Sequence, residues 1–305
     1  MNSGPRPKRS WQRVDGVLLL DKSTGMTSNS ALQSARRLFS AAKAGHTGTL
    51  DPLATGLLPL CFGEATKFSA DLLDADKTYE AQVLFGVTTD TGDAQGDVLL
   101  ERPVAFDRAD LDVALQRFRG PISQIPPMYS ALKRDGKPLY QLARQGIEVE
   151  REARAVTIHE LTLLDFSGDR CRLRVCCSKG TYIRTLAEDV GEVLGCGAHL
   201  TALRRTAVGP LSIADAVSLD QLIELPEEQR AAVLLPPDAL LQTLPAVHLD
   251  DAATLRFAHG NPVPIPDQDA LLVPGKCRVY GAARLLGLGE ADGLGAVKPR
   301  RLVCS

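Results

Sequence analysis

The chain has 305 residues, of which 44% are hydrophobic and 24% are charged, proportions typical of a globular protein. They exclude a disordered or collagen-like chain, and the length suffices for one large domain with a small one, or for two moderate domains. No run approaches the roughly 18 consecutive apolar residues of a membrane-spanning helix. The early apolar run at 16–20 is also too short for a signal peptide, so we expect a soluble, cytoplasmic protein without membrane contact.

The net charge of −2 conceals a strong segregation of charge along the chain. Residues 1–60 carry eight Lys and Arg against three Asp and Glu, and residues 273–305 carry six against two. Residues 211–272, in contrast, carry two against ten. The two basic ends could meet a polyanion while the acidic segment stays away from it, but the counts fit ordinary surface charge equally well.

Residues 1–14, with two prolines and several basic side chains, are predicted to form a disordered arm. Order is expected to begin with a buried strand at 16–20. Thr27 or Ser28 can then cap a helix that extends to Leu38, because apolar residues recur there at helical spacing.

Residues 44–56 contain three glycines and a proline, which predicts a shaped loop and a candidate site. Asp51 precedes Pro52, and this order favours extended backbone angles that can hold the carboxylate at the loop tip. The alternative is a simple turn-forming Asp-Pro pair. Asp51 gains significance if a buried cation and an aromatic ring lie beside it, and Arg184 and Tyr79 could provide them.

The rest of the chain up to about residue 248 alternates strands and helices without a regular β-α-β order. This predicts an α+β fold with a largely antiparallel sheet. The expected elements are a strand at 78–87, a helix capped by Asp107, a hairpin of strands 156–165 and 169–177, and a helix from Thr181 to Leu194 with Thr181 as its cap and Arg184 in its first turn.

The texture changes near residue 249, where prolines, short alternating strands and closely spaced glycines follow one another. We interpret residues 249–305 as a small β-barrel module and residues 224–245 as an acidic connector. The predicted organisation is therefore an arm (1–14), a large domain (15–248) and a small domain (249–305).

Metal and cofactor sites are not indicated. Seven cysteines without Cys-x-x-Cys spacing argue against disulfides and structural zinc, and Cys171 and Cys177 fall in phase with the apolar face of a strand, as packed thiols would. The five histidines lack ligand spacing, and phosphate-binding loops are absent. Asp90, Asp93 and Asp97 lack the full pattern of a calcium loop, so we predict a solvated acidic turn.

The run Gly-His-Thr-Gly-Thr-Leu-Asp-Pro-Leu-Ala-Thr-Gly at 45–56 resembles the signature loop of the TruB family of bacterial tRNA pseudouridine synthases. The resemblance is dense over residues 15–210. One departure is Ser23, where the family usually has proline after Asp-Lys. Other matching segments follow in the family's order: 21–22 with 25–28, 76–79, 127–133, 178–184 and 203–205.

The resemblance implies that Asp51 is the essential aspartate in the isomerisation of uridine 55, in the T stem-loop of tRNA, to pseudouridine. It leaves open whether Asp51 adds covalently or acts through a proton transfer from the ribose. Arg184 is implied to pair with Asp51 and keep it ionised. Tyr79 would stack on the base and help to move a proton, and Leu203 would pack on the other side of the base.

A uridine inside a folded loop has to be flipped out before a carboxylate can reach its glycosidic bond. The resemblance assigns His46 to the vacated space, where its ring stacks on the former neighbours of the base. Without the resemblance, His46 reads as an ordinary loop histidine. Lys22 and Tyr182, in matching segments, are further substrate-binding candidates. Isomerisation transfers no electrons and adds no atom, which agrees with the expectation of no cofactor and no metal.

The C-terminal module resembles a PUA-like RNA-binding domain, and the basic charge of its residues 273–305 suits phosphate contacts. We expect a monomer without an obligate protein partner. Two alternatives remain: an RNA chaperone that grips a flipped uridine without converting it, and a guide-dependent synthase of ribosomal RNA. The first would tolerate the loss of Asp51, and the second would carry basic extensions and partner surfaces that this sequence lacks.

Overall fold

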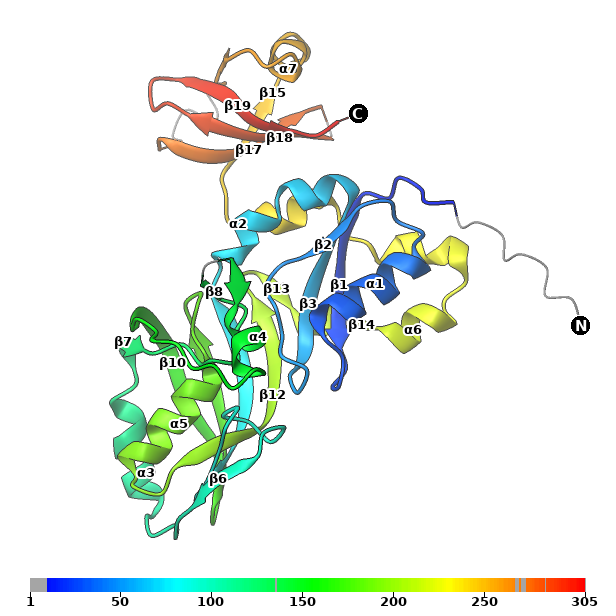
Figure 1. Cartoon of the computed structure of the whole chain (residues 1–305). Coiled ribbons are helices and arrows are strands. Elements are labelled where there is room, and N and C mark those ends of the chain that lie inside the picture. Colours follow the sequence, from blue (N-terminus) through cyan, green and yellow to red (C-terminus); the bar gives the residue numbers. More distant parts are fainter. Residues whose placement is uncertain (1–9, 135, 267–268, 270–272, 283, 305) are drawn as a thin grey trace, which may run out of the picture.

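The computed structural model describes residues 10–134, 136–266, 269, 273–282 and 284–304 (Figure 1). Most of the predicted basic arm, residues 1–9, lies outside them. The described chain forms a unit built on one large sheet and, at its C-terminal end, a smaller unit built on a second sheet. None of the described helices combines the length and the apolar character needed to cross a membrane.

Ten strands form the large sheet, which supports the predicted α+β class. The main path runs β14-β1-β3-β12-β4-β11-β10-β7, with β2 on β3 and β13 on β12. Only the pairs β1–β14 and β3–β12 are parallel among these described strands. The bounds are β1 (Gly16–Lys22), β2 (Ala44–His46), β3 (Thr55–Phe62), β4 (Lys77–Phe85), β7 (Gly120–Gln124), β10 (Arg154–Ser167), β11 (Arg170–Cys177), β12 (Ala198–Val208), β13 (Leu211–Ser212) and β14 (Val217–Ser218).

Helices α1 (Ser28–Leu38) and α5 (Ile183–Val193) cover one face of the large sheet, one over each half (Figure 1). Their inward residues, such as Leu32 and Leu186, join Val83 and Leu173 of the sheet in one hydrophobic core. Burying each such side chain contributes about 1.5–3 kcal/mol. The two helices are thereby fixed on the same face.

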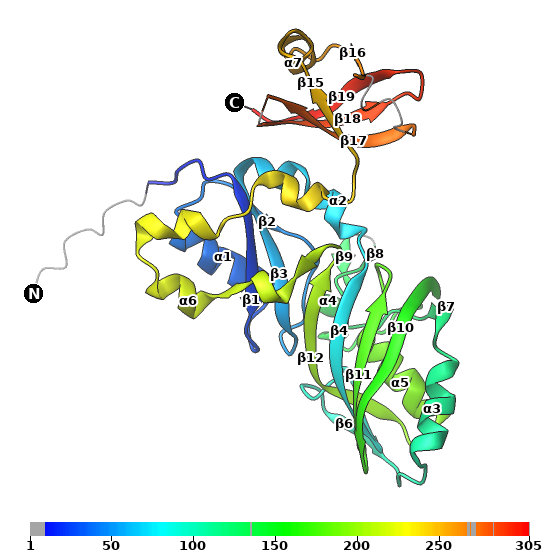
Figure 2. The ribbon, with the colours of Figure 1, turned by 180° about the vertical axis from the view of Figure 1, so that it is seen from behind.

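The opposite face carries a second core, covered by three short helices (Figure 2). These are the 3₁₀ helices η1 (Gly63–Lys67) and η4 (Pro237–Leu241), and α2 (Ser69–Leu73). The predicted connector, residues 224–245, thus packs on the sheet through the buried Leu240 and Leu241. The remaining elements of the large unit are β5 (Val87–Thr89), β6 (Val98–Glu101), α3 (Arg108–Gln116), β8 (Lys133–Arg134), β9 (Lys137–Pro138), α4 (Leu139–Ala143), η2 (Ile213–Asp215), α6 (Leu219–Glu224) and η3 (Glu227–Val233).

Local sequence signals explain most of these boundaries. Thr27 is the N-cap of α1, and its side chain accepts a hydrogen bond from the amide of Ser30 at 3.0 Å. Asp107 caps α3 in a capping box with Asp110, as predicted for Asp107. The predicted cap at Thr181 is wrong, because its hydroxyl donates to the carbonyl of Ser178 at 2.9 Å and α5 begins two residues later.

The predicted hairpin is confirmed as β10 and β11, an antiparallel pair. Cys171 and Cys177 lie buried on the core face of β11. Burial raises the pKa of each of these thiols to about 12, which supports packed, unreactive cysteines. The predicted loop at 44–56 is wrong at both ends, because residues 44–46 form β2 and β3 begins at Thr55; the loop itself spans 47–54.

The C-terminal unit is a curled sheet of five strands in the order β15-β17-β18-β19-β16 (Figure 2). The prediction of a barrel is only partly met, since β15 and β16 are edges that do not pair with one another within the described residues. The expected domain boundary at 249 falls at the end of the first strand. The elements are β15 (Ala246–Leu249), α7 (Asp251–Ala258), β16 (Val263–Pro264), β17 (Gly275–Gly281), β18 (Arg284–Ala291) and β19 (Ala296–Leu302).

Polar contacts hold the two units together. The ammonium of Lys67 donates to the carbonyl of Leu302 at 2.9 Å, and that of Lys276 lies 2.6 Å from the carboxylate of Asp71. Leu288 of the small sheet also enters the second core of the large unit.

Candidate active site

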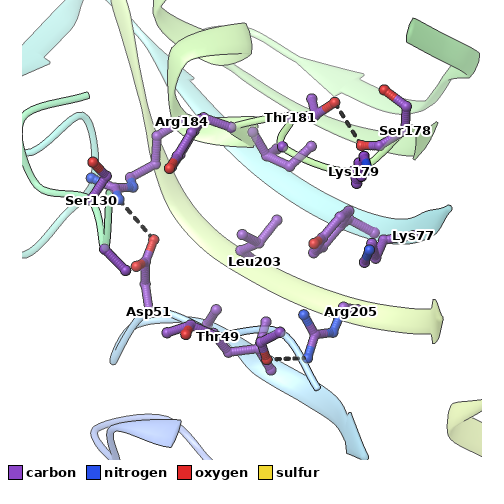
Figure 3. Close-up of a pocket in the computed structure, with 18 of the residues that line it drawn as sticks. Thr49, Asp51, Lys77, Ser130, Ser178, Lys179, Thr181, Arg184, Leu203 and Arg205 are labelled. Atoms are coloured by element: carbon purple, nitrogen blue, oxygen red, sulfur yellow. Dashed lines mark hydrogen bonds and ion pairs between the residues drawn. The ribbon is translucent and has the colours of Figure 1, made fainter. Parts of the chain in front are cut away.

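A pocket of about 320 Å³ opens on the face of the large sheet that carries α1 and α5, between α5 and the loop 47–54 (Figure 3). The residues that line it come from segments far apart in the sequence. They are Gly48–Asp51, Ala54, Leu73, Lys77, Tyr79, Ser130, Ala131, Ser178–Arg184, Leu203 and Arg205. Of the seven site residues expected from the sequence, five therefore meet in one pocket.

Asp51 and Arg184 form an ion pair at the rim of this pocket (Figure 3). A guanidinium nitrogen of Arg184 lies 2.9 Å from a carboxylate oxygen of Asp51. The Arg184 side chain is only 5% exposed, whereas that of Asp51 is 39% exposed. The guanidinium of Arg184 is thus a buried structural group, whereas the carboxylate of Asp51 remains accessible to a ligand.

The loop that carries Asp51 is anchored by the start of α1. The hydroxyl of Ser28 accepts from the amide of Leu50 at 2.8 Å and donates to the carbonyl of Leu50 at 3.0 Å. The amide of Gly25 donates to the carbonyl of Pro52 at 2.8 Å. The segment 21–28 therefore holds the loop that carries Asp51 in position.

Arg184 has three further partners. Its guanidinium donates to the carbonyls of Thr91 and Tyr129, each at 2.7 Å, and lies 3.9 Å from the carboxylate of Asp93. The predicted solvated turn is wrong for Asp93, whose side chain is 7% exposed because it faces this cation. Two carbonyls and two carboxylates around one planar guanidinium fix its orientation.

The floor of the pocket is formed by neighbouring strands. Tyr79 of β4 pairs in register with Arg205 of β12, and Leu203 lies two residues before Arg205 on the same strand. Burial raises the pKa of Tyr79, so its phenol is neutral and can donate a hydrogen bond. Leu203 contributes an apolar wall. Such a floor offers an aromatic and an aliphatic surface, against which a flat ring can pack.

Tyr182 lines the pocket immediately before α5, and its amide donates to the side chain of Gln124 at 3.1 Å. Burial raises its pKa. Lys22 and His46, in contrast, do not line the pocket. Lys22 is 1% exposed, and its ammonium donates to the carbonyls of Ser23 at 3.0 Å and Met26 at 2.8 Å.

Burial lowers the pKa of Lys22 to about 8, against the opposing effect of the Asp51 charge. Lys22 therefore stabilises the turn beneath the loop. His46 is the last residue of β2, and burial followed by the charge of Arg205 lowers its pKa. The ring is thus neutral at physiological pH, and its buried Nδ1 has no hydrogen-bond partner among the described atoms.

Sequence reasoning assigned no role to Lys77, Ser130 and Arg205, although the matching segments contain all three. Arg205 is 1% exposed; it donates to the carbonyl of Leu57 at 2.7 Å and to that of Gly48 at 3.3 Å. It thereby joins the loop to the sheet. Lys77, Ser130 and Arg205 lie in segments that match the family, and this was the sequence signal that could have found them. A matching segment does not show which of its residues line the pocket and which support it.

Strands β3 and β12 approach closely at Gly56, beneath the site. This glycine adopts φ +99°, and a Cβ there would lie 2.3 Å from the carbonyl oxygen of Arg205. Gly56→Ala is expected to lower the free energy of unfolding by roughly 3 kcal/mol or more, measured by urea denaturation. Gly120→Ala, with φ +82° and open space, should cost only about 1 kcal/mol. Equal losses would show that backbone strain alone matters.

Within the described residues, no group of three or more His, Cys, Asp and Glu side chains is arranged to hold a metal ion. The groups that line the pocket are instead a fixed carboxylate, buried cations and neutral hydroxyls. This set can orient a polar ring, exchange a proton or supply an oxygen nucleophile.

Family models match most of the chain. Residues 36–183 match the TruB family pseudouridylate synthase N-terminal domain. Residues 184–242 match the tRNA pseudouridylate synthase B C-terminal domain, and residues 245–303 match the pseudouridine synthase II TruB C-terminal domain. The chain is 63% identical over 296 residues to the tRNA pseudouridine synthase B of Dechloromonas aromatica, covering 97% of this chain and 98% of that protein.

The protein of the same name from Cupriavidus metallidurans is 59% identical over 310 residues, covering 99% and 98% of the two chains. Among solved structures, a chain of a Cbf5-Nop10-Gar1 complex superimposes with a TM-score of 0.73 at 26% identity, covering 99% of this chain and 91% of that one. A chain of an archaeal box H/ACA sRNP Nop10-Cbf5 complex gives 0.70 at 25%, covering 94% and 85%. With relatives this similar over nearly their full length, the chain belongs to the TruB family of pseudouridine synthases.

Proposed function

We propose that this enzyme, which isomerises uridine to pseudouridine in tRNA, acts at position 55 in the T stem-loop and uses Asp51 as its reacting group. The observation that carries the proposal is the ion pair of a partly open Asp51 with a buried Arg184, at the rim of a pocket that suits a pyrimidine. Carboxylates held by a buried cation are typical of catalytic groups.

The reaction balances without a cofactor. The glycosidic bond from N1 to C1′ breaks, a bond from C5 to C1′ forms, the hydrogen on C5 leaves as a proton, and N1 takes up a proton. Asp51 would act at the sugar or at the base, as a nucleophile or as a base. The neutral phenol of Tyr79 can stack on the ring and pass a proton, and Leu203 can cover the opposite face of the ring.

We assign the remaining residues to binding of the flipped nucleotide. Tyr182 lines the same pocket as Asp51. The neutral ring of His46 suits the space that the base leaves in the loop, because stacking needs no charge. Lys22, buried under the loop, would act on the substrate by holding the Asp51 loop in position.

The basic C-terminal sheet is proposed to be a PUA-like module that contacts the same tRNA through phosphates. We further propose that the enzyme works as a cytoplasmic monomer without an obligate protein partner. The solved Cbf5 structures are complexes with partner proteins, so a guide-dependent enzyme is the alternative. Activity of the purified chain on tRNA alone would separate the two.

The deciding experiment is tritium release from unmodified tRNA labelled at C5 of uridine, since isomerisation keeps the mass but frees that hydrogen. We expect about one tritium released per tRNA. The same tRNA with cytidine at position 55 should release none above background. Full tritium release from the tRNA with cytidine at position 55 would show that another uridine is the target. No release from the unmodified tRNA despite tight binding would favour an RNA chaperone.

A further inference from the structure

The single tryptophan of the chain lies on the surface, where the chain passes the C-terminal end of α1. Trp11 is 47% exposed, and the guanidinium carbon of Arg36 lies 4.4 Å from the centre of its ring. The amide of Gln12 donates to the carbonyl of Ser40 at 2.8 Å, and its carbonyl accepts from the amide of Ala42 at 2.9 Å. The indole is therefore fastened beside an arginine instead of packing into a core.

The arginine is itself held in place. Its Nε donates to the carbonyl of Ala41 at 2.9 Å, and its Nη2 to that of Ala42 at 2.8 Å. These carbonyls follow a sharp reversal at Ser40, which adopts φ +50°, a conformation that costs a non-glycine residue about 1–2 kcal/mol. The turn thus fixes the guanidinium that faces the indole, while Trp11 remains exposed to solvent.

Two more cations belong to the same turn. Arg37 precedes it, Lys43 follows it, and both are exposed. Among the described residues, no carboxylate forms an ion pair with Arg36, Arg37 or Lys43. We call Trp11, Arg36, Arg37 and Lys43 the Trp11 surface. Within the part of the chain that the structure describes, it combines an exposed aromatic ring with cations that form no ion pair.

This surface and the pocket belong to the same side of the molecule. Helix α1 lies on the face of the large sheet that also carries α5 and the pocket (Figure 1). Lys43 immediately precedes β2, and β2 ends at His46, next to the loop of Asp51. At about 3.4 Å per residue, Lys43 and His46 are at most about 10 Å apart along the strand. A tRNA bound beside His46 can therefore also contact Lys43 of the Trp11 surface.

We propose that the Trp11 surface is a second contact for the tRNA whose uridine occupies the pocket. Arg37 and Lys43 bind phosphates, and the open side of the indole stacks on an unpaired base. Aromatic rings interleaved with unpaired cations are the usual platform for single-stranded nucleic acid, and the arginine strengthens the stack. An acidic peptide would satisfy the cations but offer no flat partner for the indole. The proposal rests on the proposed function in taking tRNA as the ligand.

Intrinsic fluorescence gives a direct test, because all tryptophan emission of the chain comes from Trp11. Titration with unmodified tRNA is expected to quench this emission with the same midpoint as filter binding, and to protect the indole from acrylamide. Unchanged emission and unchanged acrylamide quenching at saturating tRNA would overturn the proposal. If tRNA leaves the indole untouched, the surface is open to a protein partner instead.

Variants give the second test. Trp11→Ala is expected to weaken tRNA binding at least fivefold, and Trp11→Phe to regain most of the loss. The Arg37→Gln/Lys43→Gln double variant should lower the slope of log affinity against log salt by about 2. The matched control is Arg170→Gln/Arg172→Gln, since these exposed arginines alternate with core residues of β11 and face away from the helices. An equal change in the control would overturn the proposal.

The outcomes separate this inference from the proposed function. The rate of tritium release at saturating enzyme is expected to stay within twofold of wild type in all these variants. Normal tritium release without any change in Trp11 fluorescence on adding tRNA would refute the second contact but support the proposed enzyme function. Quenching by tRNA without any release would keep the contact and remove the assignment of the reaction.

Discussion

Asp51→Asn is expected to abolish tritium release, lowering the single-turnover rate by at least about 10⁴-fold. The substitution keeps the shape of the side chain but removes the charge, and with it the capacity to act as a nucleophile or a base. The dissociation constant for tRNA should stay within about threefold of wild type, because most of the affinity comes from phosphate contacts. Single-turnover release and filter binding on the same preparation measure the two quantities.

A matched control is Asp112→Asn, which makes the same change at a half-exposed position on α3 that does not line the pocket. It should leave both the rate and the affinity unchanged. Release by Asp51→Asn at more than about one hundredth of the wild-type rate would remove Asp51 from the chemistry. A parallel loss of rate and affinity would instead assign Asp51 to binding, where its contact with Arg184 would shape the pocket.

The elements that the sequence predicted well are those with a strong local cause. Helix α3 has both a capping box and an apolar stripe, and Leu111 and Leu115 are indeed buried. Strand β11 alternates cysteine, leucine and valine with arginine, a pattern that only one orientation on the core satisfies. Local chemistry alone determines such elements, so a single sequence suffices to find them.

The missed features depend on contacts between distant segments. Asp93 looked like part of a solvated turn because its partner, Arg184, lies 91 positions away in the chain. The short strand β2 formed within the predicted loop because β3 offers it a hydrogen-bonding edge. Backbone carbonyls of its own turn surround the ammonium of Lys22, an arrangement that the sequence does not reveal. Neither hydropathy nor spacing encodes such pairings.

In the candidate site, too, local sequence indicated single residues, whereas their contacts depend on distant segments. The loop with Asp51 was identifiable from its turn residues and then from its resemblance to a family, and Arg184 and Tyr79 were named as its possible neighbours. These three residues meet only in the tertiary structure, because α5 carries Arg184, β4 carries Tyr79, and the loop before β3 carries Asp51. The supporting role of Arg205, which ties the loop to the sheet, needed the structure.

Arg184→Lys is expected to lower the rate of tritium release by about a hundredfold or more, with little change in tRNA affinity. An ammonium keeps the charge but cannot serve Asp51, Thr91 and Tyr129 at once, as the planar guanidinium does. A loss of about 3 kcal/mol in the positioning of the carboxylate corresponds to this factor. Arg102→Lys, at an exposed pair with Glu192, is the matched control and should behave as wild type.

Arg184→Ala should be more severe, since it leaves the buried carboxylate of Asp93 facing no cation from α5. Removing one partner of a buried pair costs about 3–5 kcal/mol, so the free energy of unfolding is expected to fall by that amount in urea denaturation. Arg184→Lys should unfold nearly as wild type, which separates misfolding from loss of positioning. If both variants bind tRNA weakly and the bound complex turns over at the normal rate, Arg184 is a phosphate ligand, and the orientation of Asp51 does not depend on it.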